Sequence, residues 1–224
     1  MDKLRIDVNS ILEFFDENRT VSKHSNAIKT VAGEEFMFAL LFEYFRRANI
    51  EAELICRSCT TGRQRGPRLD GWVKAQGKNE AEPTYYQVEV KLWSAHGVGG
   101  GARFFNPNDD LAEFKKRLWE TYWDQENERF SDPVLNKVLT PMACPIAEGK
   151  IEPLACLWSP VHPEGKVEPY FHRSLTPSTP FNRVWVFSAS SFLRQIRDHE
   201  PTLEMQLPEV AERIRWLNQI FVSP

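Results

Sequence analysis

The sequence predicts an α/β protein in which helices flank a mixed central sheet. Runs with the strand period of two alternate along the chain with longer runs of helical periodicity. The chain has 224 residues, of which 42% are hydrophobic, as is ordinary for a chain that buries one sizeable core. The longest strongly apolar run, FMFALLF at residues 36–42, is far too short to span a bilayer. We therefore expect one domain over residues 1–224, with an αβββαβ core over about residues 26–190 and C-terminal helices over about residues 191–224.

Each element follows from a local pattern. The stretch at about residues 26–48 is rich in Ala, Leu, Phe and Glu and contains no proline, so it predicts a long helix. Asn106 and Pro107 suit the cap and first position of a further helix, whose apolar stripe is Leu111, Phe114, Leu118 and Tyr122. A proline-rich stretch between the last two strands is expected to be irregular. In order, the predicted elements are helices at 11–18 and 26–48, strands at 51–57, 69–76 and 85–93, a helix at 107–122, strands at 153–161 and 183–190, and helices beginning near 191 and 208.

The third predicted strand, YYQVEVKLW, carries an acid and a base on one face. Because side chains alternate along a strand, Val88 and Val90 point to the core with their neighbours of the same parity, whereas Glu89 and Lys91 share the other face. A short turn separates this strand from the preceding one, so the two are expected to pair as a hairpin. That pairing brings Asp70 to the face that carries Glu89 and Lys91.

Two carboxylates brought together repel each other unless a cation lies between them, and oxygen-rich pairs suit Mg²⁺ or Mn²⁺. A lysine beside such a cation can hold a water or a phosphate oxygen. The segments RLDGW and VEVK, with the predicted order of elements, resemble the PD-(D/E)xK nuclease superfamily over about residues 26–135. Leu69 stands where the family name has a proline.

The resemblance implies a restriction-endonuclease-like fold and a Mg²⁺- or Mn²⁺-dependent endonuclease that hydrolyses phosphodiester bonds in DNA, in restriction, phage defence or repair. It implies that Asp70, Glu89 and the carbonyl of Val90 hold the metal and that Lys91 positions or deprotonates the attacking water. The family often adds a glutamate from the preceding helix, and GEEF offers Glu35, with Glu34 as its rival.

A basic loop leads into Asp70. Arginine matches phosphate oxygens in fork geometry, so this loop is a candidate nucleic-acid contact, although a solvated loop would have the same composition. His96, in a glycine-rich loop, is a candidate contact to the scissile phosphate or an ordinary loop histidine. The candidate nucleic-acid-binding residues are Arg57, Arg63, Arg65, Arg68 and His96.

Three alternatives stay open at this point. Glu89 and Lys91 can be solvated residues on the exposed face of an edge strand, with Asp70 in a turn. The chain can be a non-catalytic interaction subunit that keeps the fold. It can also be a zinc-stabilised nucleic-acid-binding module built on Cys56 and Cys59, although Cys144 and Cys156 are not spaced as a second pair. Base stacking is considered only for Trp72 and Trp93.

Composition adds little about partners. The formal net charge is −3, so nothing in the overall charge indicates nucleic acid or an anionic membrane. MDKLRIDVNS lacks the apolar segment of a signal peptide, and four cysteines form no disulfide framework. We expect a soluble cytoplasmic protein whose partners are DNA and either a second copy or another protein of a multi-component system.

Overall fold

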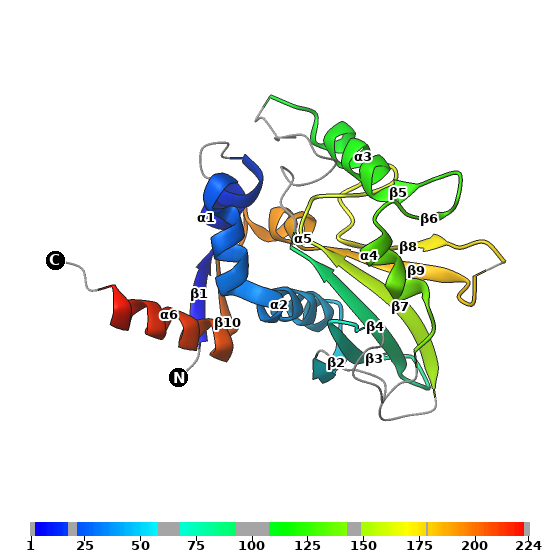
Figure 1. Cartoon of the computed structure of the whole chain (residues 1–224), viewed down its shortest axis with the longest axis horizontal. Coiled ribbons are helices and arrows are strands. Elements are labelled where there is room, and N and C mark those ends of the chain that lie inside the picture. Colours follow the sequence, from blue (N-terminus) through cyan, green and yellow to red (C-terminus); the bar gives the residue numbers. More distant parts are fainter. Residues whose placement is uncertain are drawn as a thin grey trace.

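The computed structural model describes residues 3–17, 22–57, 68–92, 108–142, 149–177 and 179–221, with the backbone alone for residues 22–29. Its centre is a mixed six-stranded sheet (Figure 1). The first three strands of the sheet form an antiparallel meander, the next two continue it in parallel, and the last lies antiparallel at the far edge. In spatial order the strands are β2 (Ile50–Arg57), β3 (Gly71–Gly77), β4 (Thr84–Lys91), β7 (Lys150–Leu157), β9 (Arg183–Ser188) and β8 (Tyr170–Ser174).

Helices cover both faces of this sheet. Apolar residues of α2 (Ser22–Arg47) and α5 (Ala189–Ile196) pack with Tyr86, Val88 and Val90 in one core. Apolar residues of α3 (Leu111–Tyr122) pack with Tyr85 in a second core. Strand β4 is therefore buried on both faces, as expected of a central strand in a three-layer α/β protein.

The second core is completed by short elements that follow α3. They are β5 (Trp123–Asp124), β6 (Arg129–Phe130), α4 (Pro133–Asn136) and the 3₁₀ turn η3 (Lys137–Leu139). Figure 1 shows α4 over the sheet near β7. Leu135 and Val138 are fully buried there, which fixes this segment against the face of β4 that carries Glu89.

The first and last strands of the described chain pair with each other outside the main sheet. Strand β1 (Lys3–Asp7) pairs antiparallel with β10 (Thr202–Gln206), and α6 (Pro208–Ile220) follows directly. Between β1 and α2 lie α1 (Val8–Leu12) and the π-helical turn η1 (Glu13–Glu17). Figure 1 shows α6 beside β1 and β10, on the side of α2 that faces away from the sheet.

The α/β class and the antiparallel pairing of the second and third predicted strands are confirmed. The helix predicted at residues 107–122 begins at Leu111, with Asp110 accepting hydrogen bonds from Ala112 and Glu113, and three of its four stripe residues are fully buried. Residues 170–174, expected to be irregular, form β8. The C-terminal stretch expected to be helical contains β10.

The long helix α2 is interrupted at Gly33, which has φ +60° and ψ −169°. Glycine adopts this conformation without steric cost. A Cβ at this position would lie 2.7 Å from Nη1 of Arg213, which donates to the carbonyl of Val31. The interruption makes Glu34 and Glu35 the first residues of a new helical segment, where the helix dipole favours carboxylates.

Lys115 on α3 is a fully buried lysine whose Nζ has no hydrogen-bond partner among the described residues. Burial, and secondarily the charge of Arg194, lower the pKa of Lys115 from 10.5 to about 8. Below pH 8 the folded protein therefore holds a buried ammonium for which the described residues offer no hydrogen-bond acceptor.

We expect Lys115→Met to stabilise the protein by about 1–3 kcal/mol at pH 7. Because the unfolded chain keeps its proton up to a higher pH than the folded one, wild-type stability should rise with pH between about 8 and 10.5. The gain from Lys115→Met should shrink over the same range. Urea unfolding at several pH values checks this, with the exposed neighbour Lys116→Met as control; an equal effect of both substitutions would contradict it.

Candidate metal and phosphate site

The candidate site lies where β3 begins and β4 ends. Gly71 pairs with Val88, so the next position of the register places Asp70 opposite Glu89. The Asp70 N–H donates to the Val88 carbonyl at 3.1 Å, and Asp70 Oδ2 accepts from the Val90 N–H at 2.7 Å. Backbone groups of alternate residues point to the same side of a strand, so the Val90 carbonyl lies on the Asp70 side of β4.

Glu89 is fully buried, and each of its carboxylate oxygens contacts a lysine. Lys91 Nζ donates to Oε1 at 2.7 Å. Lys137 Nζ lies 2.7 Å from Oε2 as an ion pair, while its hydrogen bond goes to the carbonyl of Arg68, also at 2.7 Å. The alternative of solvated residues on an edge strand is wrong, because β4 lies between β3 and β7 and Glu89 is inaccessible to solvent.

Burial dominates the electrostatics of Glu89 and raises its pKa. The contacts with Lys137 and Lys91 lower this pKa, and the nearby charge of Asp70 raises it. The net direction is upward, so the ionised carboxylate is held at a cost that an additional cation beside it would reduce.

Lys137 is the site residue that sequence reasoning missed. It belongs to η3, far from the motif in the chain, and no periodic pattern marks it. The amide of Gln87, on the same face of β4 as Glu89, holds the segment in place. Gln87 Nε2 donates to the carbonyls of Val138 and Thr140, and its Oε1 accepts from the Met142 N–H at 3.2 Å.

The two glutamates of α2 have different surroundings. Glu35 is buried, and its carboxylate accepts the N–H groups of Glu209 at 3.2 Å and Val210 at 2.8 Å, at the start of α6. Glu34 is half-buried, and its pKa is raised first by burial and then by the charge of Asp70. The Glu35 carboxylate is therefore engaged at the α6 N-terminus, whereas Glu34, its rival, is the glutamate whose pKa responds to the charge of Asp70.

The predicted phosphate-binding residues also lie in different surroundings, some near α6 and some near the site. Arg57, at the end of β2, contacts the carboxylate of Glu209 and lies 3.8 Å from that of Glu35, so its guanidinium bridges α2 and α6. Arg68 is exposed, and its charge lowers the pKa of Glu34. Arg63, Arg65 and His96 lie outside the described residues.

The aromatic residues of this region belong to the core. Trp72 is 1% exposed and packs with α3, so the proposal that it stacks on bases is wrong. Tyr85, on the same face, is also buried. Trp93 lies outside the described residues.

The oxygen donors of the site fit a hard divalent cation in chemical type. Asp70 and Glu89 supply carboxylates and Val90 a carbonyl, which are ligands that Mg²⁺ and Mn²⁺ accept. No group of three or more His, Cys, Asp or Glu side chains that could hold a metal occurs within the described ranges. Glu34 is thus not a third direct ligand in this arrangement, and the backbone carbonyl and water would complete the set.

The cysteines give no support for zinc in the described part of the chain. Cys56 is disulfide-bonded and has no free thiolate, and Cys156 is free but buried in the core. Burial raises the pKa of the Cys156 thiol well above its usual value. Cys59 and Cys144 lie outside the described residues.

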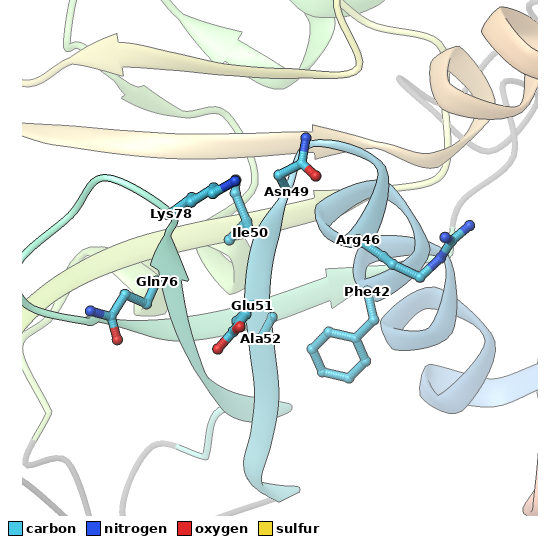
Figure 2. A pocket seen from close by; sticks show the side chains of 9 residues that line it. Phe42, Arg46, Asn49, Ile50, Glu51, Ala52, Gln76 and Lys78 are labelled. Atoms are coloured by element: carbon cyan, nitrogen blue, oxygen red, sulfur yellow. The ribbon is translucent and has the colours of Figure 1, made fainter.

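An open cleft of about 800 Å³ lies at the other end of the β2–β3 ladder (Figure 2). Ile50, Glu51, Gln76 and Lys78 line it together with Arg46, and Ile50 pairs with Gly77 there. Strand β3 runs from Gly71 to Gly77, so roughly 20 Å separates this cleft from the candidate site. The cleft therefore shares no lining residue with the site.

Comparison with known proteins adds no functional information: the chain matches no family model, no curated protein and no solved structure. Within the part of the chain that the structure describes, no helix is both long and apolar enough to cross a membrane.

The different contacts of Glu35 and Glu34 lead to a stability prediction. Glu35→Ala removes a charged acceptor from two backbone N–H groups and should destabilise the protein by about 1–3 kcal/mol. Glu34→Ala is the matched control, and it should be neutral or slightly stabilising because it removes repulsion with Asp70. Urea unfolding at pH 7 measures both, with hydrogen exchange at the α6 amides to locate the change. Equal effects of the two substitutions would contradict the assignment.

Proposed function

We propose that the chain is a metal-dependent nuclease of the restriction-endonuclease-like fold that hydrolyses phosphodiester bonds in DNA. The observation that carries this proposal is the placement of Asp70 opposite Glu89, with Lys91 on one Glu89 oxygen and the Val90 backbone between them. The antiparallel meander β2–β3–β4, continued in parallel by β7 after the α3 crossover, supports the proposed fold.

The residues divide the chemistry among them. Asp70 and Glu89, with the Val90 carbonyl, would hold Mg²⁺ or Mn²⁺. When bound, the cation supplies Lewis-acid stabilisation of charge developing on the phosphate. Lys91 is held by Glu89 as an ammonium and would orient the attacking water; it can take up the proton of that water only after it has released one of its own. Glu34, rather than the predicted Glu35, would contact the cation through a bound water, since the Glu35 carboxylate is engaged at the start of α6.

The choice of DNA rests on the resemblance and on the arginines that precede Asp70. Arg68 is exposed next to the site, and the carbonyl of Arg68 contacts Lys137. A phosphate backbone entering from this side would meet positive charge before it reached the carboxylates. We place the activity in restriction, phage defence or repair.

Lys91→Ala should abolish cleavage of labelled DNA in Mn²⁺ or Mg²⁺, because it removes the base or water-positioning group. Folding should persist at reduced stability, because Lys137 still pairs with the buried Glu89 carboxylate. The measurement is single-turnover cleavage with and without EDTA, with Lys78→Ala, at the exposed turn after β3, as control. Cleavage by Lys91→Ala at the wild-type rate would sink the assignment.

Metal binding is tested separately through stability, so that the test does not depend on a missing partner. With an affinity near ~1 mM and ~10 mM Mg²⁺, binding to the folded state should add about 1.4 kcal/mol. For a domain of this size that corresponds to a rise of roughly 3–5 °C in melting temperature. Asp70→Asn keeps the shape and an acceptor for the Val90 N–H, and it should lose most of this rise while melting close to the wild type in EDTA, where the lysines already offset the carboxylates.

The control for this experiment is Asp198→Asn, which changes an exposed carboxylate outside the site. Asp198→Asn should keep the full metal-dependent shift. A full shift in Asp70→Asn would show that Asp70 is not a ligand. Absence of any shift in the wild type with Mg²⁺ and Mn²⁺ would favour a non-catalytic subunit.

A further inference from the structure

Each oxygen of the Glu89 carboxylate already has a lysine beside it in the metal-free protein. Lys91 contacts Oε1 and Lys137 contacts Oε2, both at 2.7 Å, and the side chain is fully buried. A divalent cation that approaches Glu89 therefore meets two ammonium groups, whose positive charges repel it and compete with it for the carboxylate. The two lysines differ in origin, since Lys91 lies on the same strand as Glu89 whereas Lys137 comes from η3.

The backbone that carries Lys137 is held in place, so the lysine stays beside the site when its ion pair is broken. Val138 and Leu139 are buried beside it, and Gln87 holds the backbone from Val138 to Met142 by three hydrogen bonds. The Lys137 ammonium also donates to the Arg68 carbonyl, directly before Leu69 and Asp70. Its side chain is 25% exposed, so the ammonium is at the border between the buried carboxylate and solvent.

We propose that Lys137 is a phosphate-binding residue of this site, which neutralises Glu89 in the metal-free protein and contacts a non-bridging phosphate oxygen of a polynucleotide once a divalent cation has taken its place on Glu89. An ammonium has three N–H donors, and the Arg68 carbonyl uses only one. A phosphate oxygen supplies an acceptor of the opposite charge on the solvent side. Gln87 is the positioning residue, since its amide fixes the segment that carries Lys137.

This inference rests on the proposed function and extends it with a residue outside the motif. It has one consequence without DNA and one with DNA. Without DNA, Lys137 competes with the cation for Glu89, so removing the lysine charge should strengthen cation binding. With DNA, the same removal should weaken the contact with phosphate and slow cleavage. A purely structural lysine would not affect the two measurements in opposite directions.

The test uses the full chain and three variants: Lys137→Met, Lys137→Arg and the control Lys78→Met. Calorimetric titration with Mn²⁺ in the absence of DNA should show Lys137→Met binding about threefold to tenfold more tightly than the wild type, because a positive charge beside the cation is gone. Single-turnover cleavage of a labelled duplex by Lys137→Met should be about 10- to 100-fold slower, because a charge-assisted contact is lost. Lys137→Arg should recover most of the rate, and Lys78→Met should match the wild type in both assays.

Melting curves in EDTA check that every variant is folded. If Lys137→Met does not fold, the same two measurements on Lys137→Arg still test the inference. Wild-type Mn²⁺ affinity together with a wild-type cleavage rate in Lys137→Met would overturn the inference and leave the proposed function standing. A wild-type cleavage rate in Lys137→Met overturns the phosphate assignment whatever its Mn²⁺ affinity. Absence of Mn²⁺ binding and of cleavage in the wild type would overturn the proposed function, and the inference with it.

Discussion

The buried carboxylate of Glu89 is the group around which this end of the molecule is organised. An ionised carboxylate without solvent is strongly unfavourable unless it is paired and hydrogen-bonded. Lys91 from its own strand and Lys137 from η3 provide that pairing. The segment after β6 is therefore held to the sheet by charge as well as by Leu135 and Val138, which are buried in the second core. A structure that needed only stability would place an apolar residue at position 89, so the retained charge is an argument for function.

The interruption of α2 at Gly33 is followed by two adjacent glutamates, Glu34 and Glu35, that have different roles. Side chains of consecutive helical residues point in directions about 100° apart, so only one of Glu34 and Glu35 can face the site. Glu35 points to the α6 N-terminus and joins Arg57 and Glu209 there. Glu34 is left on the side of Asp70. The contact of Arg213 with Val31 ties the same interruption to α6, so the C-terminal helix helps to set which glutamate approaches the sheet.

What the sequence predicts well here is local. Period-two alternation and a short turn identify the β3–β4 pair, and with it the approach of Asp70 to Glu89. The position of Lys137 beside Glu89 could not be predicted in this way. It depends on the contact between Gln87 and Val138, which are 51 residues apart and show no periodic signal. The choice between Glu34 and Glu35 depends on a positive φ at Gly33, which the helical composition of the surrounding stretch conceals. Strand β1 pairs with β10 across nearly the whole chain, so neither strand has a partner that local reasoning could find.

Charge balance connects the proposed cation and the proposed substrate. Glu34, Asp70 and Glu89 carry negative charge toward one region, and Lys91, Lys137 and Arg68 offset it in the absence of metal. A divalent cation adds two positive charges to a region that is already nearly neutral, and a phosphodiester brings one negative charge. Each ligand therefore makes the region more favourable for the other, since charges within a few ångströms interact by several kcal/mol at the effective dielectric of a protein surface. Metal and polynucleotide should bind with positive coupling, and by linkage the coupling acts equally in both directions.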